Sequence, residues 1–145
     1  MDSNTLVSPL TIEVYKALKF GKKLRYIIFE LSSDFTEIVV EKTGDFVEQT
    51  DHTGPYNEFL SNLPKDEPRY AVYDFNYKGP KGDHRNKTIF YLWNPDDADI
   101  EKKLAYDSNT DALRRLLTGV DMEIECTDLS ELNYQDVLHK ADRST

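Results

Sequence analysis

An internal disulfide is excluded by composition, because the 145 residues include a single cysteine, Cys126. Glycine and proline number only six each, and no low-complexity segment or linker interrupts the chain. No apolar run approaches the roughly 20 residues of a membrane-spanning helix. Positive charge is also scarce: 18 lysines and arginines face 27 acidic residues, for a formal net charge of −9. Long-range attraction to nucleic acid or anionic lipid is therefore not expected.

The residues that are present are typical of a folded domain. Hydrophobic residues make up 39% of the chain and aromatic residues 12%, too much for a disordered tail. We expect one domain over residues 1–145, with a mobile arm over residues 1–8. The start, "MDSNTLVSP", has neither the basic region nor the apolar run of a signal peptide, so we expect a cytoplasmic protein.

Hydrophobic periodicity and turn residues predict strands in two hairpins, one later strand, and helices between them. The expected strands are residues 24–31, 35–42, 69–77, 86–93 and 122–129. The expected helices run from Ser8 and Pro9 to Gly21, then over residues 56–63, 99–117 and 130–142, the last with Ser130 as N-cap. Residues 43–56 are polar and predict a surface loop. This order indicates an α/β or α+β fold, a sheet covered by helices.

Catalytic and metal-binding sites find little support in the sequence. His52, His84 and His139 lie in different expected elements without partners at metal-ligand spacing, so we expect no metal and no cofactor. Cys126, within an apolar strand, is better explained as a small buried hydrophobe than as a nucleophile. Clustered aspartates in "NPDDAD" suit a helix N-terminus, where carboxylates satisfy free N–H groups. We therefore expect no enzymatic activity, with a hydrolase as a remote alternative.

Three stretches together resemble the actin-depolymerising factor/cofilin family: "YAVYDFNY", "LWNPDDADIEKKLAY" and "TDALRRLLTGV". The resemblance extends from Ser3 to about Arg143. It implies a mixed sheet of five to six strands flanked by helices, the ADF-homology or gelsolin-like fold, with one long kinked helix. It also implies a protein that binds monomeric and filamentous actin, prefers the ADP-bound subunit, and severs and depolymerises filaments without making or breaking a covalent bond.

The long helix of the family corresponds to residues 99–117, with "YDSNT" as its kink, and its exposed first half enters a cleft on actin. Local propensity alone predicts two helices, because the residues of this stretch compete for backbone hydrogen bonds. The resemblance implies actin-monomer contacts at this helix and at the N-terminal arm, through Ser3, Asn4, Glu101, Lys102, Lys103 and Leu104. Core packing is the alternative interpretation, favoured for the leucines, for the apolar residues of this stretch: Ile100, Leu104, Leu113, Leu116 and Leu117.

Two positions depart from the family pattern. The family usually has basic residues at the positions of Glu101 and Lys103, and here the first is an acid; Lys102 lies about 100 degrees around the helix and replaces it imperfectly. We expect weaker rather than abolished affinity for actin. Ser3 falls at the family's regulatory phosphorylation site, but Asn4 replaces the glycine that commonly follows, so an unmodified solvated serine is the alternative.

A second, filament-specific surface is implied at Arg85, Lys87, His139, Lys140 and Arg143. Arg85 and Lys87 are two apart on a strand and share a face, and Lys140 and Arg143 are three apart on a helix. His139 replaces a usual acid, and because histidine titrates near neutral pH, filament binding through it could strengthen on acidification. Ordinary solvated surface cations are the alternative explanation for this set.

The leading functional hypothesis is a monomeric, cytoskeleton-associated regulator that severs actin filaments. A side-binding or branch-regulating relative, coactosin-like or glia-maturation-factor-like, is the alternative, and it would bind monomeric actin little. Phosphoinositide binding through basic surfaces is known in the family, but the net charge of −9 predicts that it is weak here.

Overall fold

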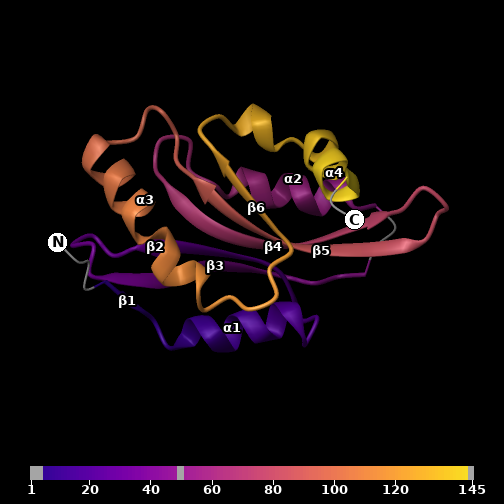
Figure 1. The fold of residues 1–145 in the computed structure, drawn as a ribbon, viewed down its shortest axis with the longest axis horizontal. Coiled ribbons are helices and arrows are strands. Elements are labelled where there is room, and N and C mark those ends of the chain that lie inside the picture. The colour runs from indigo at the N-terminus through magenta and orange to yellow at the C-terminus, as the bar shows by residue number, and fades with distance from the viewer. Residues whose placement is uncertain (1–4, 49–50, 144–145) are drawn as a thin grey trace.

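The computed structural model describes residues 5–48 and 51–143, and its centre is one six-stranded sheet in the order β1-β3-β2-β4-β5-β6 (Figure 1). The strands are β1 (Leu6–Val7), β2 (Leu24–Leu31), β3 (Glu37–Asp45), β4 (Arg69–Lys78), β5 (His84–Trp93) and β6 (Met122–Cys126). The helices are α1 (Leu10–Lys19), α2 (Thr53–Ser61), α3 (Ile100–Arg114), a 3₁₀ turn η1 (Leu129–Leu132) and α4 (Tyr134–Arg143). The mixed-sheet fold class is as predicted.

Both parallel pairs lie at the edges of the sheet. The four central strands pair antiparallel through two hairpins, β2–β3 and β4–β5, which are joined where β2 pairs with β4. β1 pairs parallel with β3, and β6 pairs parallel with β5. Two parallel strands need a crossover connection between them. The chain passes from β1 to β3 through α1 and β2, and from β5 to β6 through α3.

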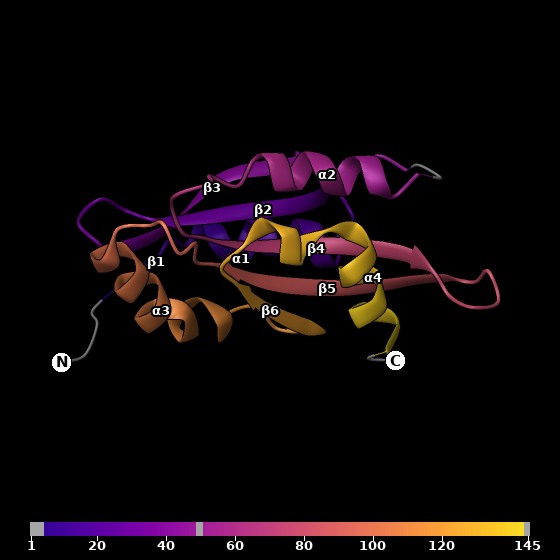
Figure 2. The same ribbon diagram turned by 90° about the horizontal axis from the view of Figure 1, so that it is seen from above.

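Helices cover both faces, so the molecule has three layers with a core on each side of the sheet. In Figure 1, α1 lies below the sheet and α2 and α4 lie above it, and Figure 2 looks onto the face that α2 and α4 cover. α1 and α3 pack on one face, against side chains such as Ile27, Phe29 and Val72. α2 and α4 pack on the other, where tyrosine and phenylalanine rings dominate; Phe59 of α2, for example, lies 4.9 Å from Tyr73 between ring centroids. Because helices cover both faces, every residue of β4 except Lys78 is buried, including the polar Arg69, Asp74 and Asn76.

Several element boundaries differ from the prediction. The arm expected over residues 1–8 contains β1, in which Leu6 is paired with Glu37 of β3, and residues 1–4 lie outside the described part of the chain. β3 continues to Asp45 because Thr43 and Gly44 pair with β2, so the expected loop begins later. Pairing with a neighbouring strand stabilises these polar residues more than their local preference for a turn.

The helix ends also differ. α2 begins at Thr53, three residues before the prediction. β6 ends at Cys126, and the single last helix expected from Ser130 is divided into η1 and α4 by Asn133, whose backbone is extended. Asn133 accepts a hydrogen bond from the Asp136 N–H at 3.1 Å and donates to the Asp136 carboxylate at 2.7 Å. It therefore caps α4 in the role that was assigned to Ser130.

Candidate functional site

The first candidate surface is built on α3, which is one continuous helix over Ile100–Arg114. Asp99 caps its start by accepting from the Lys102 N–H at 3.4 Å. Inside the "YDSNT" stretch, Asn109 donates to the carbonyl of Ala105 at 2.8 Å and Thr110 to that of Tyr106 at 2.9 Å. These side chains bond back to their own helix instead of breaking it. Bonds of this kind often bend helices, and they lie where the family kink is expected.

Three side-chain hydrogen bonds hold α3 on the sheet. The Tyr70 hydroxyl donates to the carbonyl of Tyr106 at 2.5 Å, and the Tyr106 hydroxyl accepts from the backbone N–H of Leu31 at 2.9 Å. The Asn94 amide donates to the carbonyl of Lys103 at 3.2 Å. Because each bond joins a strand or its end to the helix, the first half of α3 is held in a defined position.

Two large apolar side chains of that first half point into solvent. Ile100 is 67% exposed and Leu104 is 63% exposed, one helical turn apart on one face. Core packing, the interpretation favoured for the leucines, is therefore wrong for Leu104; Leu116 is also 39% exposed. It is confirmed for Leu113 and Leu117, which are fully buried. Burying a leucine is worth about 1.5–3 kcal/mol, so exposed leucine on a fixed helix indicates a surface that a partner covers.

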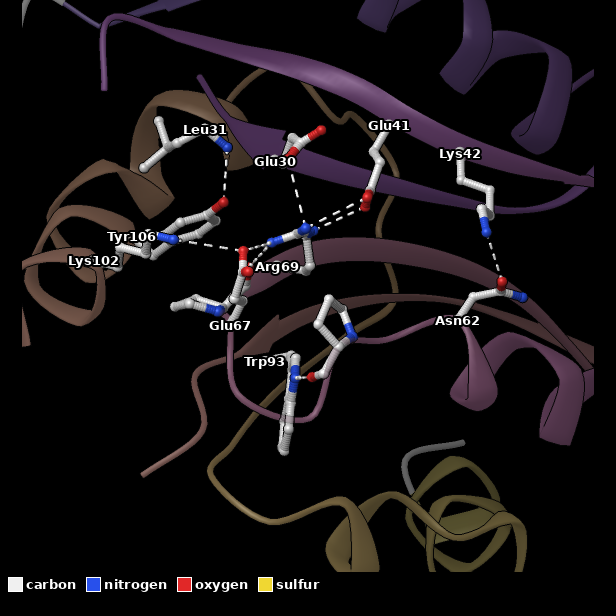
Figure 3. A network of polar contacts seen from close by, with 12 residues as sticks. Glu30, Leu31, Glu41, Lys42, Asn62, Glu67, Arg69, Trp93, Lys102 and Tyr106 are labelled. Carbon is white, nitrogen blue, oxygen red and sulfur yellow. Dashed lines mark hydrogen bonds and ion pairs between the residues drawn. The ribbon is translucent and has the colours of Figure 1, made fainter. Parts of the chain in front are cut away.

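The charges around this surface differ in how far they are neutralised. Glu101 is exposed and has no ion pair among the described residues. The Lys102 ammonium lies 3.6 Å from a carboxylate oxygen of Glu67, and that of Lys103 lies 3.7 Å from Asp96 (Figure 3 shows the first contact). Sequence reasoning missed both acidic partners. Glu67 precedes β4 and lies far from α3 along the chain, and Asp96, in the "NPDDAD" stretch, was interpreted only as a carboxylate for the helix N-terminus. Lys102 is thus turned toward the sheet, which weakens it further as a replacement for a cation at position 101.

Glu67 belongs to a larger network centred on Arg69, whose side chain is only 8% exposed (Figure 3). The Arg69 guanidinium contacts Glu41 at 2.8 Å, Glu67 at 3.3 Å and Glu30 at 3.5 Å. Burial disfavours the charged arginine, but the hydrogen bond and charge of Glu41 outweigh it and raise the pKa of Arg69. Lys102 is therefore connected, through Glu67, to a buried cation that joins β2, β3 and β4.

The carboxyl groups of this network respond in opposite directions. The hydrogen bond from Arg69 lowers the pKa of Glu67 below its usual range. Burial raises the pKa of Glu30, and the more distant Arg69 only partly offsets that effect. The greater burial of Glu30 and the hydrogen bond that Arg69 donates to Glu67 together explain the difference.

The N-terminal segment borders the same region. β1 contacts α3, and Figure 1 shows the two elements at the same end of the molecule. The Leu6 side chain of β1 is 68% exposed. Ser3 and Asn4, the arm residues assigned to the monomer contact, lie outside the described residues.

The second candidate surface combines β5 and α4. The Arg85 guanidinium lies 3.8 Å from the carboxylate of Asp142 in α4, and its Nε donates to Asp83 in the β4–β5 turn at 2.8 Å. Lys87 shares the face of Arg85 by strand alternation. His139, Lys140 and Arg143 are exposed on α4, along an open groove of about 620 Å³ that Glu131 and Asp136 also line. The predicted set is brought together, on a surface of mixed charge.

Other kinds of site are not indicated within the described residues. No group of three or more potential metal-ligating side chains comes together there, and no helix among them is long and apolar enough to cross a membrane. Cys126 is 5% exposed, and burial raises the pKa of its thiol to about 12, so the thiol is protonated at neutral pH. This confirms Cys126 as a small buried hydrophobe.

Comparison with known proteins agrees with this geometry. The family model described as cofilin/tropomyosin-type actin-binding protein matches residues 4–142. The chain belongs to this actin-binding family. Cofilin of Mycosarcoma maydis is 43% identical to it over 145 residues, which cover 100% of this chain and 99% of that relative.

Solved structures of the cofilin family show the same fold. The crystal structure of Streptomyces griseoflavus cofilin superposes with a TM-score of 0.84 at 46% identity and covers 95% of this chain and 98% of that one. Actin depolymerization factor 2 of Plasmodium berghei superposes with a TM-score of 0.86 at 26% identity, with 100% of both chains covered. The family resemblance and the expected fold are confirmed, and the family is defined by actin binding rather than by catalysis.

Proposed function

We propose that this protein binds both monomeric and filamentous actin, prefers ADP-actin, and promotes turnover by severing and depolymerising filaments, as a monomer in the cytoplasm. The observation that carries the proposal is the exposed apolar pair Ile100 and Leu104 on a helix that three hydrogen bonds fix to the sheet. A fixed apolar ridge costs little entropy to bury, so it suits insertion into a cleft of a partner. The family model supplies the identity of that partner.

Charge on this ridge favours a moderate affinity. Glu101 faces solvent beside Leu104, whereas Lys102 and Lys103 are already engaged by Glu67 and Asp96. An acidic partner surface such as that of actin would be repelled by Glu101 and would have to compete for both lysines. Rim charges of this kind are worth about 0.2–1 kcal/mol each, so the apolar contacts remain the larger contribution.

The filament contact is proposed at Arg85, Lys87, His139, Lys140 and Arg143. The ion pair of Arg85 with Asp142 supports the proposal because it joins the β5 cations to α4, so the two parts form one surface. Two surfaces at different ends of the molecule would let one protein contact two neighbouring subunits of a filament. If the protein binds one conformation of the filament more tightly than another, its binding shifts the filament toward that conformation.

Two titrations test the proposal. The first follows binding to fluorescently labelled ADP-actin monomers, and the second measures co-sedimentation with ADP-actin filaments. We expect saturable binding in both. Replacement of Lys140 and Arg143 by alanine together should weaken filament binding and leave monomer binding unchanged, whereas Lys65→Ala, which removes an exposed lysine elsewhere, should change neither.

The alternative relatives predict another pattern. A coactosin-like or glia-maturation-factor-like protein would sediment with filaments, or act at branches, and bind monomeric actin little. The 43% identity to a named cofilin over the full chain supports the first assignment. Weak binding to phosphoinositide-containing vesicles would be compatible with it, since the chain has basic patches within an overall acidic surface.

A further inference from the structure

A second buried arginine, Arg25, is placed very differently from Arg69. Both are almost fully buried, at 4% and 7% exposure. Arg69 contacts three carboxylates, whereas Arg25 forms no ion pair within the described part of the chain. Its Nη2 donates to the carbonyl of Val47 at 2.7 Å, and its Nε has no hydrogen-bond partner there. A buried guanidinium without a counter-charge is costly, because charge is removed from water without compensation.

Arg25 lines a pocket of about 530 Å³ whose other charged groups are mostly cationic. Lys78 and His84 of its lining flank the β4–β5 turn, so the pocket lies at the end of the sheet from which that hairpin projects. Figure 1 shows the projecting hairpin. Its lining combines the cations with two amides and a carboxylate: Lys22, Arg25, Phe46, Glu48, His52, Asn76, Lys78, His84 and Asn86. Cations outnumber carboxylates even when both histidines are neutral.

The acidic groups nearby do not balance this charge. Asp74, buried next to the pocket, is 3.8 Å from the Lys22 ammonium and accepts from the Asn86 amide. Its partner is therefore Lys22, not Arg25. Glu48 is exposed and forms no ion pair among the described residues. Arg25 and Lys78 form no ion pair among the described residues, although Glu48 borders the same pocket and the second carboxylate oxygen of Asp74 is buried without a hydrogen-bond partner there.

His52, in the pocket wall, is affected by this excess of positive charge. Burial lowers the pKa of His52, and the charges of Arg25, His84 and Lys78 lower it further, while Asp51 opposes them. The Nδ1 atom of His52 is buried and has no hydrogen-bond partner in the described chain. Hydrogen-bonding groups and cations thus lie together in one concave site, where the Arg25 Nε and the His52 Nδ1 have no hydrogen-bond partner among the described residues.

We propose that this pocket binds a small soluble anion that carries a phosphoryl group, such as pyrophosphate or a phosphate monoester. A phosphoryl group offers several acceptor oxygens for the Arg25 Nε, for the His52 ring and for the second N–H of the Asn76 and Asn86 amides, each of which already donates one hydrogen bond to Asp74. Its negative charge matches the excess of cations. The Phe46 ring, which the Arg25 guanidinium covers at 4.3 Å, holds that guanidinium against the wall.

The pocket is separate from the proposed filament surface. Asn76, Lys78, His84 and Asn86 point to the face of the sheet on which α1 packs, because they alternate with Tyr77 and Arg85, which point toward α4. Ligand binding at the pocket can therefore be measured without involving Lys140 and Arg143.

Calorimetry with sodium pyrophosphate, together with amide chemical shifts of the ¹⁵N-labelled protein, tests the proposal. We expect saturable binding at millimolar concentration or below, with shifts at Lys22, Phe46 and Asn76. Lys78→Ala and His84→Ala should each weaken binding at least threefold. Lys81→Ala, which removes a lysine from the same hairpin but outside the pocket, should change it less than twofold.

Arg25→Met supplies a further check, with its fold confirmed by thermal unfolding. Loss of pyrophosphate binding in a folded Arg25→Met protein would support the proposal. Absence of saturable binding by the wild type would overturn it, and so would equal weakening by Lys78→Ala and Lys81→Ala, because that result would show attraction to net charge alone.

Discussion

Leu104 and Ile100 stay exposed on α3 although the opposite side of the same helix is fully packed. The helix has enough apolar residues for both sides: Leu113 is fully buried, and Tyr106 is buried with its hydroxyl bonded to β2. The exposed pair therefore adds nothing to the core and is available for a partner. This distinction separates the effect of a substitution on folding from its effect on binding.

Leu104→Asp should lower affinity for actin monomers at least tenfold, because a charge replaces a central apolar contact, and tenfold corresponds to about 1.4 kcal/mol. The free energy of unfolding should change by less than about 0.5 kcal/mol, since the side chain is exposed. Titration with labelled ADP-actin and urea unfolding measure the two effects. Leu116→Asp, beyond the end of the same helix, is the matched control and should leave actin affinity unchanged. Unaltered affinity in Leu104→Asp would remove this ridge from the contact.

Glu101→Arg should strengthen actin binding, because it replaces a repulsive charge by the basic residue usual in the family. A gain of about two- to thirtyfold follows from reversing a rim charge worth about 0.2–1 kcal/mol on each side. The gain should shrink as salt is raised from 50 to 300 mM, because salt screens exposed charges. Glu101→Gln should give an intermediate affinity. A weaker Glu101→Arg protein would show that Glu101 meets a cation on actin.

At the scale of elements, α3 shows what local sequence predicts and what it misses. Propensity predicts an interruption at "YDSNT", yet Asn109 and Thr110 bond to carbonyls of their own helix, and the Tyr70 hydroxyl supports Tyr106 in the same turn. Those supports come from tertiary packing, which a local pattern does not contain. The hairpins were predictable because alternation and turn residues agree there. The pairing of β1 with β3 was not, since two residues carry no periodicity.

The candidate site, like the fold, was only partly predictable from the sequence. The positions on α3 follow from sequence motifs, but the exposure of Leu104 does not, because a leucine in a helical repeat is usually buried. The acidic partners of Lys102 and Lys103 were missed, since Glu67 reaches Lys102 only through the fold. Asn133 was also missed as the α4 cap, because Ser130 offered an equally good capping residue in the sequence.

The Arg69 network predicts opposite pH effects from two of its carboxylates. The pKa of Glu67 is lower in the folded than in the unfolded state, so its contribution to stability is present above the unfolded value near 4.5 and is lost as pH falls. The raised pKa of Glu30 acts in the reverse sense: folding is penalised above its folded pKa, and the penalty disappears on acidification.

Urea unfolding at pH 6 and pH 3.5 tests these signs. Glu67→Gln should lose less stability than the wild type between the two pH values, and Glu30→Gln should lose more. Each difference should be below about 1 kcal/mol, because both side chains are partly exposed. If the two variants changed in the same direction, the assignment of Arg69 to a tight contact with Glu67 and a looser one with Glu30 would be wrong.

At the scale of the whole molecule, two cores share one sheet, so opening one side exposes the strands on which the other depends. Cys126 reports on this cooperativity, because it lies in the core beneath α2 and α4 and has no exposed thiol. We expect unfolding to be a single cooperative transition.

The thiol should react with iodoacetamide at pH 8 at least a hundredfold more slowly in the native than in the urea-unfolded protein. Burial and the raised pKa of Cys126, about 12, both reduce the thiolate available for reaction. Mass spectrometry of samples quenched over time, across a series of urea concentrations, compares the alkylation midpoint with that of circular dichroism. Fast alkylation in buffer would show that the α4 side opens locally, independently of global unfolding.

The central claim is that the fixed ridge of α3 and the β5–α4 surface together make this protein a filament-severing factor. The most direct measurement is time-resolved fluorescence microscopy of single ADP-actin filaments, counting breaks per filament length as protein is added. We expect breaks to increase with the wild type and to fall to background with Leu104→Asp. Filaments that are decorated but do not break, or that bind no protein, would contradict the claim.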